Sequence, residues 1–145
     1  LIAYCGDVLF PSLLISSIID TINKGMIFSS TDNSIERYKK FKTFIFNEFH
    51  KYPKNKMGES FELIYINKDA NNVAYPKFYA YKVSWNKEKG FSSRSLKIPE
   101  KSGIIHVMGS GSKKFNEMYM KFQKKKSKGT SRNIYINVLL NCFLK

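Results

Sequence analysis

The segment between residues 33 and 52 constrains the fold more than any other part of the sequence. Asn33 followed three residues later by Glu36 resembles a capping box, in which two side chains satisfy N–H groups at the start of a helix. Apolar side chains then recur every three to four residues opposite a basic face, and Pro53 follows, so we expect an amphipathic helix that ends near Tyr52. The expected apolar stripe consists of Ile35, Tyr38, Phe41, Phe44, Ile45 and Phe49.

The first 23 residues predict a strand that leads into another helix. Residues 1–5 are an apolar run, and Gly6 and Asp7 end it. The Asp7 carboxylate can accept the N–H groups that a helix leaves without partners in its first turn. Apolar residues then recur with helical spacing between residues 12 and 23, ahead of a Lys-Gly pair that ends the helix.

A run of strands is expected in the middle of the chain, followed by two more helices. Apolar and aromatic residues indicate four strands, with a turn at 86–90 that ends in a glycine. Sequential strands between two helix pairs predict an α+β fold with antiparallel strands and helices packed on the sheet faces. The expected strands are 61–66, 78–85, 91–98 and 103–108, and the expected helices are 112–125 and 133–144.

Length and composition bound the class of protein. The chain has 145 residues, which fits one domain over 1–145, and 43% hydrophobic residues exclude global disorder. No apolar run approaches the roughly 20 residues of a membrane span, so we expect no membrane partner. Cys5 and Cys142 are the only cysteines, which suits a reducing compartment and predicts a cytoplasmic location. Both ends lie inside apolar runs, so we expect a piece of a longer reading frame, truncated at both ends.

The net charge of +14 favours contact with polyanions. A nucleic-acid site would place aromatic and arginine side chains on the charged face. Here lysines dominate, and the neighbouring aromatics fall on the apolar stripes. This favours solvated helix faces, with a polyanion surface as the alternative. The basic clusters are 37–42, 51–56, 113–114 and 121–128.

Several short motifs are candidates for chemistry. Gly109-Ser110-Gly111 would let a backbone approach a ligand, but it is neither a P-loop nor a dinucleotide fingerprint, and a tight turn is the simpler interpretation. Cys5 beside a helix start could be a reactive thiol, although a small buried residue at a strand end is simpler. His50 and His106 lack metal-ligand spacing, so we expect no metal, no cofactor and a structural role for His106 on its strand.

Two segments, in this order and at this separation, resemble proteasome β subunits and the bacterial HslV protease. Leu1-Ile-Ala-Tyr-Cys-Gly-Asp-Val8 before an apolar helix is similar to their strand, small-Gly turn and helix. About a hundred residues later, Ile104-Ile-His-Val-Met-Gly-Ser-Gly-Ser112 is similar to their apolar strand and GSG turn before a helix. The intervening helix and antiparallel strands also occur in that family, so the resemblance covers most of the chain.

The family is the N-terminal nucleophile (Ntn) hydrolases, and the resemblance implies an αββα sandwich and a peptidase mechanism. An amino-terminal Thr, Ser or Cys attacks the substrate, and its own α-amine acts as the base. By match, the N–H of Gly6 would stabilise the oxyanion, and Ser110 would hydrogen-bond near the terminal amine. Family members assemble into rings, so a homo-oligomer is expected by analogy.

The family's nucleophile has no counterpart in this sequence. The hairpins that carry it precede the turn that matches Gly6, and here only five residues do. Leu1 cannot attack a carbonyl, and Cys5 ends a strand whereas the family's nucleophile begins one. We therefore expect an incomplete Ntn-hydrolase-like domain that is inactive as it stands, with the activity of a longer parent left open. The alternative is a basic module that binds nucleic acid or an acidic protein.

Overall fold

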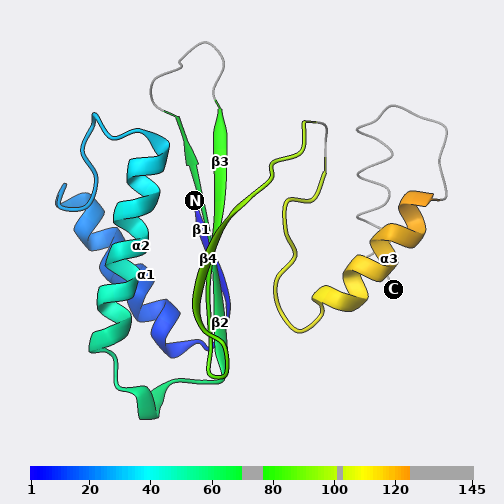
Figure 1. Ribbon diagram of the computed structural model, residues 1–145, viewed down its shortest axis with the longest axis horizontal. Helices are drawn as coiled ribbons and strands as arrows, with labels where there is room; N and C mark the ends of the chain where they lie inside the picture. Colours follow the sequence, from blue (N-terminus) through cyan, green and yellow to red (C-terminus); the bar gives the residue numbers. More distant parts are fainter. Residues whose placement is uncertain (70–76, 101–102, 125–145) are drawn as a thin grey trace. The chain divides into compact units, whose positions relative to one another are not determined.

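The structure is a computed structural model that describes residues 1–69, 77–100 and 103–124. Its contacts divide the chain into two units, one spanning Leu1–Leu96 and another that begins at Lys97. The first unit contains a four-stranded sheet and two α-helices, and the second contains one described helix (Figure 1). The fold is therefore α+β, as the order of elements predicts.

The first unit runs strand, helix, helix, strand, strand, strand along the chain. Its elements are β1 (Ile2–Gly6), α1 (Leu9–Asn23), α2 (Ser34–Lys51), a 3-10 turn (Lys54–Lys56), β2 (Ser60–Lys68), β3 (Phe78–Asn86) and β4 (Gly90–Leu96). The strands pair antiparallel in the order β1-β2-β3-β4. Each strand therefore lies beside its neighbour in chain order, and β1 and β4 are the outer strands of the described sheet.

Both helices pack on one face of the sheet (Figure 1). Side chains alternate between the two faces along a strand, so every second residue of β2 and β3 points toward the helices. The sequence predicts that Tyr79, Tyr81, Val83 and Trp85 share one face, and all four belong to the helix-side core or pack against it. The buried core consists of Phe10, Leu14, Ile18, Phe41, Ile45, Phe61, Leu63, Tyr65, Tyr81 and Val83.

Aromatic stacking fixes α2 on the sheet. The ring centroids of Phe41 and Tyr65 lie 4.2 Å apart, and those of Tyr38 and Tyr81 lie 3.8 Å apart with nearly parallel planes. Such pairs contribute about 0.5–1.5 kcal/mol beyond their area burial. Because Tyr65 and Tyr81 are paired across β2 and β3, the two contacts hold α2 over both strands. Burial raises the pKa of Tyr65.

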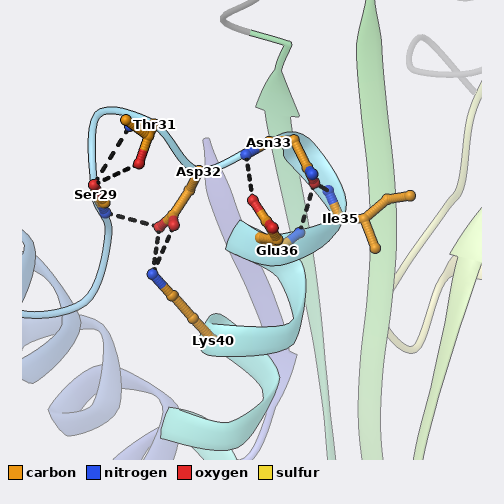
Figure 2. A network of polar contacts seen from close by, with 7 residues as sticks. All are labelled: Ser29, Thr31, Asp32, Asn33, Ile35, Glu36 and Lys40. Carbon is orange, nitrogen blue, oxygen red and sulfur yellow. Dashed lines mark hydrogen bonds and ion pairs between the residues drawn. The ribbon is translucent and has the colours of Figure 1, made fainter.

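The predicted ends of α2 and of the β3–β4 turn are confirmed. The Asn33 side chain accepts the N–H groups of Ile35 and Glu36, and the Glu36 carboxylate accepts the N–H of Asn33 at 2.9 Å (Figure 2). This reciprocal pair is the predicted capping box. The helix ends at Lys51, directly before Tyr52. Gly90 closes the turn with a φ of +73°, which glycine adopts without strain.

The second unit departs from the sequence prediction at one element. Residues 103–108, expected as a fourth strand, form no strand in the structure. Apolar composition favours a strand only where a neighbouring strand supplies a ladder, and none of the described strands forms a ladder with residues 103–108. Helix α3 (Ser112–Lys124) confirms the helix expected at 112–125. The helix expected at 133–144 lies outside the described residues. The described strands form a single sheet.

A buried carboxylate ties the loop before α2 to the helix. Asp32 accepts Nζ of Lys40 at 2.7 and 2.8 Å and the N–H of Ser29 at 2.7 Å (Figure 2). The hydrogen bond from Lys40, and then the one from Ser29, lower the pKa of Asp32 below its ordinary value of 3.8. Because the folded pKa lies below the unfolded one, ionised Asp32 stabilises the fold above the unfolded value. That stabilisation is lost as the pH falls through the folded value.

Asp32→Asn should therefore make stability less sensitive to acid. We expect the melting temperature of the wild type to fall more steeply than that of the variant between about pH 5 and pH 2. Circular dichroism melts across this range measure the difference. Asp20→Asn is the matched control, because Asp20 also pairs with a lysine, at 2.7 Å, but its side chain is 62% exposed. If the melting temperatures of wild type and Asp32→Asn fell equally with decreasing pH, ionised Asp32 would not be the source of the stabilisation.

Candidate functional site

The predicted oxyanion residue lies in a sharp turn between β1 and α1. Gly6 has a φ of +96°, a conformation that L side chains rarely adopt. A Cβ atom at this position would lie 2.4 Å from the carbonyl oxygen of Ser60 and 2.9 Å from Cα of Phe61. Both the backbone conformation and the close approach of β2 therefore require glycine here.

Asp7 holds this turn against the segment that leads into β2. Its Oδ1 accepts the N–H of Leu9 at 3.0 Å, which confirms the expected contact with the first turn of the helix. Its Oδ2 accepts the N–H of Gly58 at 2.7 Å, and its own N–H donates to the carbonyl of Ser60 at 2.9 Å. One side chain thus accepts one N–H at the start of α1, whose N-cap residue is Val8, and joins two distant segments of the chain.

Asp7→Ala is expected to lower the free energy of unfolding by about 1.5–3 kcal/mol, the range for hydrogen bonds to charged groups. Asp7→Asn keeps one carbonyl acceptor and should lose less. Urea denaturation followed by tryptophan fluorescence measures both. Ser16→Ala is the control, because it removes an exposed side-chain hydrogen bond within α1 and should change stability by less than about 0.5 kcal/mol. An equally small loss for Asp7→Ala would show that Asp7 does not hold the turn against the segment before β2.

The pairing of β1 with β2 directs the N–H of Gly6 away from the sheet. Ile66 donates its N–H to the carbonyl of Leu1, and Asp7 donates its N–H to the carbonyl of Ser60. Hydrogen-bonded positions alternate along an antiparallel pair, so the odd-numbered residues of β1 bond to β2 and Gly6 does not. This amide therefore lies at the outer edge of the described sheet, where an N–H can donate to a developing oxyanion.

Cys5 lies one residue before Gly6, on the sheet face opposite the helices. Its partner on β2 is Glu62, which forms an ion pair with Lys82 on the same face. The thiol is partly exposed, whereas the sequence predicts a buried residue. Cys5 is the penultimate residue of β1, one residue before the end of the strand rather than at the end as predicted. This position differs from that of an Ntn nucleophile, which begins a strand.

Ser110 lies in an exposed turn of the second unit. Gly109 has a φ of +94°, and its carbonyl accepts the N–H of Ser112 at 3.1 Å at the start of α3. No atom lies within 4 Å of a Cβ added at Gly109 or Gly111, so close approach does not explain these glycines. His106 precedes the turn but lies on no strand, contrary to the prediction. Gly6 and Ser110 belong to different units, and their juxtaposition stays a prediction.

A pocket that the sequence does not predict combines aromatic and basic side chains. The sequence favours aromatics and lysines on separate faces, but three separate segments meet here: the end of α2, the 3-10 turn with the residues after it, and the end of β3. The volume is about 600 Å³. A signal was present at the end of β3, where a core-facing Trp85 is followed two residues later by Lys87. This aromatic–basic pocket is lined by Phe49, Lys54, Asn55, Met57, Gly58, Trp85 and Lys87.

Comparison with known proteins assigns the chain to no family. No protein-family model matches the sequence, and no curated protein or solved structure matches it significantly. Among the described residues, no helix is long and apolar enough to cross a membrane. The function must therefore be inferred from the Gly6 turn and from the aromatic–basic pocket.

Proposed function

We propose that this chain carries part of a proteasome-like Ntn-hydrolase domain, a peptidase family whose complete fold is an αββα sandwich. The observation that supports this most directly is the turn at Gly6, which tolerates no side chain and directs its N–H out of the sheet. A preorganised N–H of this kind stabilises the oxyanion of acyl transfer. Gly6 would supply that donor, and none of the residues of β1 fits the role of the family's nucleophile.

The first unit also has the arrangement of one half of such a sandwich. Two helices cover one face of its antiparallel sheet. The opposite face is mixed: Ile64 is 8% exposed and Ala80 is 2% exposed, and the ion pair between Glu62 and Lys82 lies on the same face. Buried apolar side chains on this second face are suited to a second layer. In the proposal, Ser110 has the role that the resemblance implies, a hydrogen bond near the terminal amine beside the Gly6 turn.

Crosslinking tests the proposed juxtaposition of Gly6 and Ser110. Cys5 is adjacent to Gly6 and points to the sheet face opposite the helices, so Ser110→Cys in a Cys142→Ser background provides one pair of thiols. We expect a short bismaleimide to join Cys5 to position 110 within one chain. Mass spectrometry of the digested product identifies the linked peptides.

Lys42→Cys in the same Cys142→Ser background is the matched control. Lys42 is exposed on α2, and α2 covers the other face of the sheet from Cys5. We therefore expect no crosslink between Cys5 and position 42. Failure to link Cys5 to position 110, with or without a link to position 42, would refute the two-layer arrangement.

The aromatic–basic pocket favours a second candidate function, the binding of single-stranded nucleic acid. Trp85 offers a ring for stacking, and Lys54 and Lys87 lie beside it as partners for phosphates. Stacking of a base on an aromatic side chain contributes about 1–3 kcal/mol, and the net charge adds attraction that does not depend on sequence. An acidic protein would use the lysines but not the ring, so the pocket favours nucleic acid.

Fluorescence tests this second candidate because Trp85 is the only tryptophan in the chain. Titration with a single-stranded oligonucleotide should quench its emission, with an affinity that falls steeply as salt rises. Lys54→Glu with Lys87→Glu should weaken binding more than Lys39→Glu with Lys42→Glu, which makes the same charge change on the exposed face of α2. Equal losses for the two pairs would show that the pocket is not the site.

A further inference from the structure

One surface of this strongly basic protein is built without any basic side chain. All 25 lysines and arginines lie after residue 23, and the first 23 residues carry only Asp7 and Asp20 as charged side chains. These residues form β1, α1 and the turn between them. We call this part of the first unit the β1–α1 flank.

The β1–α1 flank is also apolar where it faces solvent. Val8, Leu9, Leu13 and Ile19 are each more than half exposed, and Tyr4 adds an exposed ring from β1. Scattered apolar residues are normal on a protein surface, but a group of this size within one strand–helix pair is typical of an interaction site. The flank therefore combines exposed apolar area with an absence of positive charge.

The outer edge of β1 adds unpaired backbone groups to the same surface. The even-numbered residues of β1 direct their N–H and C=O groups away from β2, and no described strand lies on that side. An open edge of this kind pairs readily with another strand. The main chain and the side chains of the flank are thus both suited to a partner.

Helix α1 lies on the β1 side of the helix layer. Phe10 of α1 packs on Phe61 of β2, with ring centroids 5.1 Å apart. In contrast, α2 reaches the other outer strand, because the ring centroids of Phe46 of α2 and Phe91 of β4 lie 5.5 Å apart. Helix α1 therefore lies nearer the open edge of β1 than that of β4, although its Leu13 side chain lines a pocket with Glu48 and Lys51 of α2.

We propose that two copies of this chain associate through the β1–α1 flank. Each copy carries a charge of +14, so contact between basic faces is repulsive, and the flank lets two copies meet without that repulsion. In an antiparallel pair of the two β1 strands, Tyr4 of one copy would lie opposite Tyr4 of the other, and Ile2 opposite Gly6. A single two-fold axis would then give a hydrogen-bond partner to every backbone N–H and C=O group of β1 that points away from β2.

Analytical ultracentrifugation over a range of protein and salt concentrations tests this inference. We expect a monomer–dimer equilibrium whose Kd falls as NaCl rises from about 0.05 to about 0.5 M, because salt screens the repulsion between the basic faces. Binding of nucleic acid would show the opposite salt dependence. The inference does not rest on the proposed Ntn-hydrolase fold, which the crosslink within one chain tests separately. The dimer would engage the N–H of Gly6 that the proposed fold assigns to an oxyanion, so one chain cannot use this amide for both at once.

Two variants of the flank sharpen the test. Val8→Lys with Ile19→Lys should raise the dimer Kd at least about tenfold, because each copy then brings positive charge to the interface. Tyr4→Pro removes an N–H that points away from β2 and should weaken the dimer while leaving the β1–β2 ladder intact. Thermal melts confirm that the variants fold.

Phe78→Lys is the matched control, because Phe78 is also about half exposed but lies on β3, outside the flank. Its dimer Kd should equal that of the wild type. A monomer at every protein and salt concentration would overturn the inference. Open-ended assembly without a dimer, or equal weakening by the control and the flank variants, would overturn it as well.

Discussion

Replacing Gly6 with alanine is expected to lower the free energy of unfolding by about 2–5 kcal/mol. A left-handed backbone conformation costs an L-residue roughly 1–2 kcal/mol. Forcing a methyl group into a closed contact adds about 1–3 kcal/mol. The crowding atoms belong to the backbone of Ser60 and Phe61, so they cannot turn aside as a flexible side chain would. Urea denaturation of wild type and variant measures the loss.

Gly25→Ala separates the two causes of this loss. Gly25 also has a positive φ, of +69°, but no atom lies within 4 Å of a Cβ added there. Its substitution should therefore cost only the conformational part, roughly 1–2 kcal/mol. Equal losses for Gly6→Ala and Gly25→Ala would show that the approach of β2 does not constrain the Gly6 turn.

Phe41→Ala should destabilise the fold by about 3–5 kcal/mol, the range for removing a buried phenylalanine from a core. Phe41 is fully buried, and its ring stacks on Tyr65 at a centroid distance of 4.2 Å. The variant loses that stacking and leaves a cavity between α2 and the sheet. Thermal and urea denaturation measure the change, and a reduced urea midpoint with an unchanged slope is expected.

Phe46→Ala on the same helix is the control for Phe41→Ala. Its ring is 44% exposed and contacts Phe91 only at the edge of the core, so its removal should cost about 1 kcal/mol. Both variants make the same change in helix propensity, which leaves burial as the difference between them. Comparable losses for the two would contradict the assignment of the buried face of α2.

The elements of the first unit could be predicted because their signals are local. A capping box needs only Asn33 and Glu36, and the position of α2 follows from apolar spacing within the helix itself. The shared face of β3 follows in the same way from alternation along one strand. Such patterns indicate which residues are buried without any knowledge of what covers them.

What the sequence could not predict depends on contacts between distant segments. The outward direction of the Gly6 amide depends on the register between β1 and β2, which no local pattern specifies. The aromatic–basic pocket is formed by three separate segments of the chain, so no single stretch of sequence predicts it. Residues 103–108 have strand-like composition, but a strand also needs a neighbour to pair with.

The connectivity of the sheet also implies an order of assembly. β2, β3 and β4 pair with their neighbours in sequence, whereas β1 reaches β2 only across both helices. Closing that longer loop costs more entropy, so we expect β1 to join the sheet late in folding and to open early in hydrogen exchange. A strand that enters last and leaves first is also the element that two copies can most readily swap.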